Sequence, residues 1–332
     1  MLTSELDYDL PEDLIAQRPA DPRDASRLMV VDAKAGTIDH RIFRDLPSYL
    51  APGDALVVNE TKVLPARLFA KRPGGGEVEL LFLRDLGGAW EALARPSKRI
   101  RAGMKLEAGP DELTVDKEVG EGRWTLRGRD VQGTLQREGR MPLPPYVQAT
   151  AEAEEAYQTV YARDPGSAAA PTAGLHFTDN VLEGAARAGA EVVRVVLHVG
   201  TGTFLPVRTE KLEEHRMHAE HYRVPEDAAR SVAGAGRTVA VGTTVARTLE
   251  TWAATGEKSG DSRLFVYPGY RWRAVDALVT NFHLPRSTLL AMVMSFGGQE
   301  LVREAYRLAV EERYRFYSFG DAMLILNGGR SL

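Results

Sequence analysis

Four short segments in the second half of the chain combine histidine, threonine and glycine residues in a way that core packing does not require. They cover 171–178, 198–204, 241–247 and 280–287, and three of the four contain a histidine. Each follows or interrupts an apolar run, so we expect each to lie where a strand ends. Backbone amides, hydroxyls and imidazoles that converge at strand ends are typical of a site for a polar small molecule.

The segment 239–245 reads Val-Ala-Val-Gly-Thr-Thr-Val, which predicts a strand, a tight glycine turn and the start of a helix. Unpaired N–H groups at a helix N-terminus bind anions, and the hydroxyls of Thr243 and Thr244 can cap the helix or add donors. A carboxylate and a phosphate would suit such a site equally. An ordinary capped helix without a ligand is the alternative.

His176 and His283 each adjoin a phenylalanine and have threonine, asparagine or arginine residues nearby. A lone histidine with apolar neighbours is usually structural, but a histidine that titrates near neutrality is also the usual general base or acid. The polar neighbours favour chemistry. The chain has no Gly-x-Ser-x-Gly nucleophile motif and no Walker loop, and residues 198–204 match only half of a dinucleotide fingerprint.

His215, His218 and His221, together with Glu214 and Glu220, raise the question of a metal site. On a helix, residues three apart share a face. The zincin pattern is absent and an arginine interrupts the group, so we expect no metal. A histidine and a carboxylate presented to a substrate, or a solvated helix face, are the remaining interpretations.

At 332 residues the chain is longer than one hydrophobic core usually supports, so two domains are expected. It contains no cysteine, which excludes a thiol nucleophile, a disulfide framework and cysteine-ligated metals. The first residues lack the pattern of a signal peptide, and no stretch approaches the roughly 20 apolar residues of a membrane span. We therefore expect a soluble cytoplasmic protein without membrane contact.

Apolar periodicity divides the chain into two kinds of structure. From residue 66 to about 140, short alternating runs separated by glycines predict an all-β barrel or sandwich. Elsewhere strands alternate with helices, which is typical of an α/β fold. We predict an α/β main domain, 1–63 plus 147–332, with an inserted all-β barrel domain at 64–146. The expected strands of the main domain cover 28–31, 55–59, 191–197, 237–241 and 274–280. Its expected helices cover 151–162, 179–188, 225–235, 245–254, 287–296 and 300–314.

The inserted segment also differs in charge. Between residues 62 and 147 basic side chains outnumber acidic ones, although the whole chain has a formal net charge of −4. Its densest basic stretch is 95–101, Arg-Pro-Ser-Lys-Arg-Ile-Arg. A local positive patch can bind phosphates on an acidic protein, and a solvated loop is the alternative.

Long motifs extend along nearly the whole chain. Besides the segments that begin at His198, Val241 and Thr280, they cover 8–19, 23–30, 52–54, 59–68, 95–99, 141–147, 157–162, 170–177 and 313–323. In this order they resemble one family, the S-adenosylmethionine:tRNA ribosyltransferase-isomerases of queuosine biosynthesis. Two positions depart from its pattern: Glu60 replaces an amide with a carboxylate, and Val245 removes a hydroxyl.

The resemblance implies that the ribosyl part of S-adenosylmethionine is transferred to 7-aminomethyl-7-deazaguanine at the wobble position of tRNA. The ribose becomes an epoxycyclopentanediol, giving epoxyqueuosine, and adenine and methionine are released. S-adenosylmethionine is then a co-substrate, and no metal or other cofactor is implied. The resemblance also implies a monomer, with an α/β domain and an inserted β-barrel.

Such a reaction needs a base for the ribose 5′ proton, an acid for adenine departure, and groups that hold the methionine carboxylate and the ribose hydroxyls. As implied by the resemblance, we expect His176 or His283 to move the proton while the other orients or protonates. The turn at Gly242, with Thr244 and Arg247, would bind either the methionine carboxylate or an anticodon phosphate.

His198 is a third catalytic candidate. The other residues expected to contact the substrate are Thr172, Gly174, Thr201, Thr203, Thr243, Asn281, Asn59 and Thr61. Those expected to contact the tRNA backbone are Arg95, Lys98, Arg99 and Arg101.

Two rival functions remain open. A methyltransferase that uses the same sulfonium compound would leave S-adenosylhomocysteine, and the missing glycine-rich nucleotide loop after the first strand counts against it. A non-catalytic RNA-binding module would be basic throughout, and the acidic main domain counts against that interpretation.

Overall fold

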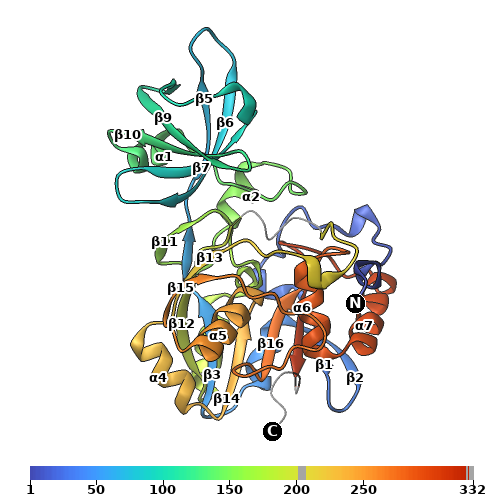
Figure 1. Cartoon of the computed structure of the whole chain (residues 1–332). Helices are drawn as coiled ribbons and strands as arrows, with labels where there is room; N and C mark the ends of the chain where they lie inside the picture. The colour runs from blue at the N-terminus through green and yellow to red at the C-terminus, as the bar shows by residue number, and fades with distance from the viewer. Residues whose placement is uncertain (201–206, 327, 329–332) are drawn as a thin grey trace.

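The computed structural model describes residues 1–200, 207–326 and 328. Its main body contains a 9-stranded sheet in the order β15-β13-β12-β3-β14-β16-β17-β1-β2 (Figure 1). The strands are β1 (Arg27–Asp32), β2 (Thr37–Ile42), β3 (Asp54–Asn59), β12 (Glu191–Leu197), β13 (Glu220–Arg223), β14 (Arg237–Val241), β15 (Ser259–Ser262), β16 (Ala277–Asn281) and β17 (Ala322–Leu326).

Four neighbouring strands, β12, β3, β14 and β16, run parallel. Every residue of β3 is buried, as expected for a strand covered on both faces. Because side chains alternate along a strand, Val57 packs into one core while Leu56 and Val58 pack into the other. The carboxyl ends of the four parallel strands meet at one edge of the sheet, so the residues that follow them are brought together.

Helices cover both faces of this sheet. The core that contains Val57 is closed by α4 (Glu226–Gly234), α5 (Thr243–Thr255), α6 (Thr288–Gly297) and α7 (Gln299–Glu311). The core that contains Leu56 is closed by α3 (Asp179–Arg187) and by the 3₁₀ turns η4 (Phe43–Tyr49) and η6 (Thr172–His176). The predicted α/β class of the main body is confirmed.

The segment between the two parts of the main body forms a closed barrel in the order β10-β7-β6-β5-β8-β9. It lies at one end of the molecule (Figure 1) and encloses its own apolar core, as the alternating runs predicted. Helix α1 (Val131–Glu138), which the sequence did not predict, contributes Val131 and Leu135 to that core. The barrel strands are β5 (Arg67–Lys71), β6 (Glu77–Asp85), β7 (Trp90–Arg95), β8 (Lys105–Ala108), β9 (Asp111–Gly120) and β10 (Arg123–Gly128). The domain bounds of 64 and 146 stay a prediction.

Some local expectations were wrong. The helix expected over 151–162 is the short α2 (Ala151–Ala156), and the chain then continues to β11 (Asp164–Ser167), which pairs with β4 (Thr61–Val63). Strand β17 was not predicted, although it fills the sheet between β16 and β1. None of the helices in the described ranges combines the length and the apolar character that a membrane-spanning helix requires.

Candidate active site

The carboxyl-terminal edge of the parallel strands gathers most of the polar residues that the sequence singled out. His198 follows β12, Thr61 lies just beyond β3, Gly242 follows β14, and Asn281 ends β16. Because these strands are neighbours in the sheet, one edge carries all four. Two adjoining cavities open there, one small and one large, and Val199 lines both.

The small cavity, of about 30 Å³, lies where η6 meets the ends of β14 and β16. Its wall holds six of the polar and turn residues in question: Thr172, Gly242, Thr243, Thr244, Asn281 and His283. No side chain with a formal charge lines it among the described residues. The cavity therefore presents hydroxyl, amide, imidazole and backbone groups, which can orient a small polar group.

Asn281 is held by a fixed set of hydrogen bonds at the edge of the small cavity. Its Nδ2 donates to the carbonyl oxygen of Tyr317 at 3.1 Å, and a carbonyl can only accept, so the orientation of the amide is determined. The same Nδ2 lies 3.1 Å from Nε2 of His176. Oδ1 of Asn281 is buried and finds no hydrogen-bond partner among the described residues.

His176 is consequently a neutral imidazole with both nitrogens in use. Since Nε2 accepts from Asn281, the proton is on Nδ1, which donates to Oγ of Ser26 at 2.8 Å. The ring stacks on Phe43, with 4.9 Å between centroids. Burial, and then the nearby Arg315 and Arg23, lower the pKa of His176 to about 3. This arrangement suits a side chain that positions Asn281.

His283 is more available. Its Nε2 lies 2.7 Å from Oγ1 of Thr280, and its backbone N–H donates to the Tyr306 hydroxyl at 2.9 Å. Within the described part of the chain, Nδ1 has no such partner, and the residue lines the small cavity. Burial lowers the pKa of His283 to about 3, so the ring is neutral near pH 7 and only weakly basic.

The N-terminus of α5 also borders the small cavity. Gly242 provides the turn with φ of 93°, a conformation that favours glycine, and its side-chain-free Cα leaves room beside Ala173. The first N–H groups of α5 have no partner within the helix. The hydroxyl of Thr244 is buried and unpaired in the described structure, so it adds a hydrogen-bonding group at the same place. The predicted strand, glycine turn and helix start are confirmed.

Arg247, which was expected to bind an anion, is engaged elsewhere. It is 3% exposed, and its guanidinium pairs with the buried carboxylate of Glu220 on β13. The other oxygen of Glu220 accepts from the N–H of Gly200 at 2.9 Å. The pair thus joins α5 to β13 and to the segment that follows His198.

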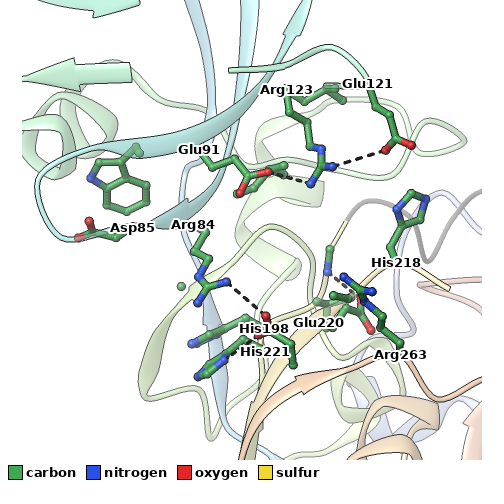
Figure 2. Close-up of a pocket in the computed structure, with 18 of the residues that line it drawn as sticks. Arg84, Asp85, Glu91, Glu121, Arg123, His198, His218, Glu220, His221 and Arg263 are labelled. Carbon is green, nitrogen blue, oxygen red and sulfur yellow. Dashed lines mark hydrogen bonds and ion pairs between the residues drawn. The ribbon is translucent and has the colours of Figure 1, made fainter. Parts of the chain in front are cut away.

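The large cavity is a cleft of about 1140 Å³ between the barrel and the main body. Figure 2 shows barrel residues on one side, where Arg123 pairs with Glu91 at 2.9 Å and Glu121 at 3.6 Å, and His198 and His221 on the other. Arginines and carboxylates both line the cleft, so it is polar without being uniformly positive. Its size suits a nucleoside or part of a polynucleotide.

His198 lies in this cleft with about a quarter of its side chain exposed. Its Nδ1 is 2.9 Å from Oγ1 of Thr61, and its Nε2 is 3.9 Å from the Asp164 carboxylate. Burial lowers the pKa of His198, whereas the charge of Asp164 acts in the opposite direction. The ring packs against Gly166, where an added Cβ would come within 2.8 Å of it.

A second histidine links the cleft wall to the barrel. The rings of His198 and His221 stack with 6.4 Å between centroids (Figure 2). Nδ1 of His221 lies 3.1 Å from Asp261, which also pairs with Arg84 of the barrel at 3.6 Å. His221 is on β13, and within the described residues 207–219 the helical structure is limited to the short turn Leu212–Glu214. The helix considered for this histidine group is therefore absent.

The other predicted site residues have mixed positions. Asn59 is fully buried, and its amide bonds to backbone groups of Leu197 and Thr61. Gly174 is buried where a Cβ would lie 2.0 Å from the Tyr161 hydroxyl. Thr201 and Thr203 lie outside the described residues.

One of the predicted tRNA-contacting residues, Arg95, ends β7, the other three follow that strand, and all four are exposed. Among the described residues, none of them pairs with a carboxylate, and one of them also lines the large cleft. They are Arg95, Lys98, Arg99 and Arg101.

Sequence reasoning missed Ser26, Asp164, Gly166 and Arg84, which contact the candidate histidines or join the two sides of the cleft. Ser26 lies within a family-like motif, which was a usable signal. Asp164 and Gly166 had none, because their roles depend on the pairing of β11 with β4.

Comparison with known proteins identifies the relatives of this chain. A family model described as queuosine biosynthesis protein matches residues 3–325. The S-adenosylmethionine:tRNA ribosyltransferase-isomerase of Rubrobacter xylanophilus is 72% identical over 100% of both chains, and that of Symbiobacterium thermophilum is 53% identical over 98% of this chain and 100% of its own. The crystal structure of S-adenosylmethionine tRNA ribosyltransferase from Thermotoga maritima is 41% identical, covers 97% of this chain and 100% of its own, and has a TM-score of 0.57.

Proposed function

The chain belongs to the queuosine biosynthesis protein family, and we propose that it is an S-adenosylmethionine:tRNA ribosyltransferase-isomerase that forms epoxyqueuosine in tRNA. The acceptor is the aminomethyl group of 7-aminomethyl-7-deazaguanine at the wobble position. Its nitrogen bonds to the ribosyl unit and loses a proton, and the bonds from ribose to sulfur and to adenine break. The ribosyl atoms rejoin as the epoxycyclopentanediol, and adenine and methionine leave. S-adenosylmethionine is consumed as a substrate, without a metal or other cofactor.

One observation carries this proposal: a small polar cavity adjoins a large cleft at the carboxyl ends of the parallel strands. A reaction between a small sulfonium compound and a nucleotide within a tRNA needs both, with the reacting atoms where they meet. Val199 lines both cavities, and His198 precedes it in the sequence. S-adenosylmethionine would extend from the small cavity into the cleft, where the modified base enters.

Two histidines are assigned to the proton transfers. His283 lines the small cavity, and its Nδ1 has no partner in the described structure, so it is placed to accept the ribose 5′ proton. Burial makes the ring a weak base, and the sulfonium next to the 5′ carbon acidifies the proton that it must remove. Burial lowers the pKa of His198, and the Asp164 carboxylate, 3.9 Å from its Nε2, acts in the opposite direction. The position of His198 in the cleft, with this carboxylate beside it, is the basis for assigning it to the protonation of the departing adenine. His176 has no free nitrogen and positions Asn281.

The exposed basic turn after β7 is assigned to the tRNA backbone. Arg95 borders the large cleft, and η5 (Ser97–Arg99) continues from it along the barrel surface. Unpaired cations beside a cleft favour the phosphates of an anticodon stem and loop. We also expect a monomer that acts in the cytoplasm.

The test is to incubate the protein with S-adenosylmethionine and tRNA that carries the precursor base, digest the tRNA, and weigh the modified nucleoside. Epoxyqueuosine is the expected product. A nucleoside heavier by one methyl group, with S-adenosylhomocysteine in solution, would establish a methyltransferase instead. Tight tRNA binding without any change in nucleoside mass would indicate a binding module.

A further inference from the structure

We infer that the small cavity binds the α-amino-acid end of S-adenosylmethionine, with the carboxylate at the N-terminus of α5 and the ammonium on Oδ1 of Asn281. This assignment rests on the proposed function, which supplies the ligand. In this assignment one wall of the cavity binds the negative carboxylate and the opposite wall binds the positive ammonium of the same substrate.

Two residues on the cavity wall each carry a buried polar atom that lacks a partner in the described structure: Oδ1 of Asn281 and Oγ1 of Thr244. Asn281 is 2% exposed and Thr244 is 8% exposed, so solvent does not replace the missing partners freely. Buried polar groups are nearly always hydrogen-bonded in native proteins. A ligand that supplies both a donor and an acceptor would satisfy the two atoms together.

The side of the cavity at α5 favours negative charge. The helix has 13 residues, so its N-terminus carries unpaired N–H groups and the positive end of the dipole. The Thr244 hydroxyl lies in the same first turn and can donate to the same anion. Arg247 does not supply this charge, because its guanidinium pairs with Glu220.

The side of the cavity at Asn281 favours a donor. Its Nδ2 is fixed on Tyr317 and His176, so only the acceptor Oδ1 remains for a ligand. A phosphodiester has acceptors alone and would leave this atom unsatisfied. A ribose diol has donors, but it is neutral and gains less from the helix dipole.

An α-amino acid fits the charge of the cavity as well. No formally charged side chain lines it within the described ranges, so an isolated buried anion would lack a countercharge. A zwitterion brings both charges and adds no net charge. The volume of about 30 Å³ suits a group of carboxylate size, and a nucleoside is much too large for it.

His176 is then a positioning residue for this subsite. Without its Nε2, the Asn281 amide loses one of two bonds that direct Oδ1 away from Tyr317. A glutamine at position 176 offers an acceptor oxygen and a donor nitrogen, so it can replace both bonds of the imidazole. His176→Gln should therefore preserve recognition of the ammonium group, whereas His176→Ala should not.

The experiment compares the affinity of S-adenosylmethionine with that of its decarboxylated analogue, by calorimetry and by inhibition of adenine release in the presence of precursor tRNA. The variants are Thr244→Val, which removes the hydroxyl at constant shape, and Thr244→Ser, which retains it. We expect the valine variant to bind S-adenosylmethionine about tenfold more weakly and the analogue as wild type does. Thr244→Ser should restore most of the preference for S-adenosylmethionine over the decarboxylated analogue. Thermal unfolding of each variant checks that it is folded.

A second arm tests the other wall with the deaminated analogue. Asn281→Ala should weaken the binding of S-adenosylmethionine about tenfold and leave the binding of the deaminated analogue nearly unchanged. His176→Ala should have the same effect to a smaller degree. His176→Gln should retain near wild-type discrimination.

Equal losses for the complete ligand and both analogues would overturn the inference, because the contacts would then be to shared parts such as the ribose. An unchanged affinity for S-adenosylmethionine, with weaker tRNA binding in Thr244→Val, would instead assign an anticodon phosphate to α5. The proposed function is judged separately: adenine release by the wild type without any carboxylate preference rejects only this subsite. Carboxylate-dependent binding without adenine release rejects only the reaction.

Discussion

Asn281 donates a hydrogen bond from Nδ2 to Nε2 of His176 across 3.1 Å, although the two residues are 105 positions apart in the sequence. The bond fixes the proton of His176 on Nδ1, which donates a hydrogen bond to Oγ of Ser26. Oδ1 of Asn281 is thereby left without a hydrogen-bond partner in the described structure, and Asn281 lines the small cavity. A histidine that resembles a general base in sequence is thus part of a substrate-positioning chain.

Replacement of the three candidate histidines should separate their roles. We expect His176→Gln to keep kcat within a few-fold of wild type, whereas His283→Gln and His198→Gln should each lower kcat by about 10² or more, as loss of a general acid or base does. Steady-state kinetics of adenine release provides the measurement. A His176→Gln variant with the largest loss in kcat would assign the proton transfer to His176.

The stability of the protein should fall as the pH decreases below neutrality. Burial lowers the pKa of both His176 and His283 to about 3 in the folded state, while the unfolded chain binds their protons below about pH 6.5. Their stabilising contribution is complete above pH 6.5 and is lost progressively as the pH falls toward 3. Each histidine should contribute roughly 1 kcal/mol per pH unit within that range.

Urea unfolding at pH 7, 6 and 5 measures this effect, and His176→Gln serves as the comparison. The variant should show a pH dependence smaller by about one proton. Identical slopes for the two proteins would mean that His176 takes up a proton in the folded state.

Gly166 should be required for the position of His198. An added Cβ would lie 2.8 Å from Cε1 of the ring, and the backbone φ of 149° disfavours any other residue. We expect Gly166→Ala to reduce kcat about tenfold or more, because the ring must leave Thr61 and Asp164. The matched control is Gly234→Ala in α4, where nothing lies within 4 Å of the added atom, and its kinetics should match the wild type.

The buried pair of Arg247 and Glu220 should matter for stability more than for ligand affinity. Arg247→Met would remove the guanidinium from a buried ion pair while the Glu220 carboxylate stays in place, which costs about 3–5 kcal/mol of unfolding free energy. The double variant with Glu220→Met should recover part of that loss. The exposed pair of Arg307 and Glu304 on α7 is the control, and its removal should change the urea midpoint little.

The basic turn after β7 should control the salt dependence of tRNA binding. Each lost phosphate contact should reduce the slope of log K against log salt by roughly 0.7–0.9. We therefore expect glutamine at Arg95, Lys98 and Arg99 to weaken tRNA binding and flatten its salt dependence. Glutamine at Arg230, an exposed residue of α4, should leave the slope unchanged.

The central strands could be predicted from sequence because they are buried on both faces. Residues 191–197 and 237–241 are rich in valine and lie between turn residues, and the predicted bounds agree with those of β12 and β14. The glycine turn at Gly242 could also be predicted, because it depends only on neighbouring residues. Three of the four segments, those that begin at His198, Val241 and Thr280, indicated strand ends correctly, because strand ends are determined by nearby residues. The expectation was wrong for 171–178, which contains the 3₁₀ turn η6 and the N-cap residue of α3.

The chemistry of individual side chains was less accessible, because it depends on distant partners. Arg247 resembles an anion-binding residue until Glu220, on another strand, is brought against it. His176 resembles a base until Asn281 and Ser26 occupy its two nitrogens. Neither pairing has a signature in the local sequence.

The most direct test of the proposed reaction is the stoichiometry of small-molecule release. With tRNA that carries the precursor base, the account predicts one adenine and one methionine for each S-adenosylmethionine consumed, and no release with tRNA that lacks this base. Formation of S-adenosylhomocysteine, or consumption of S-adenosylmethionine without adenine release, would contradict it.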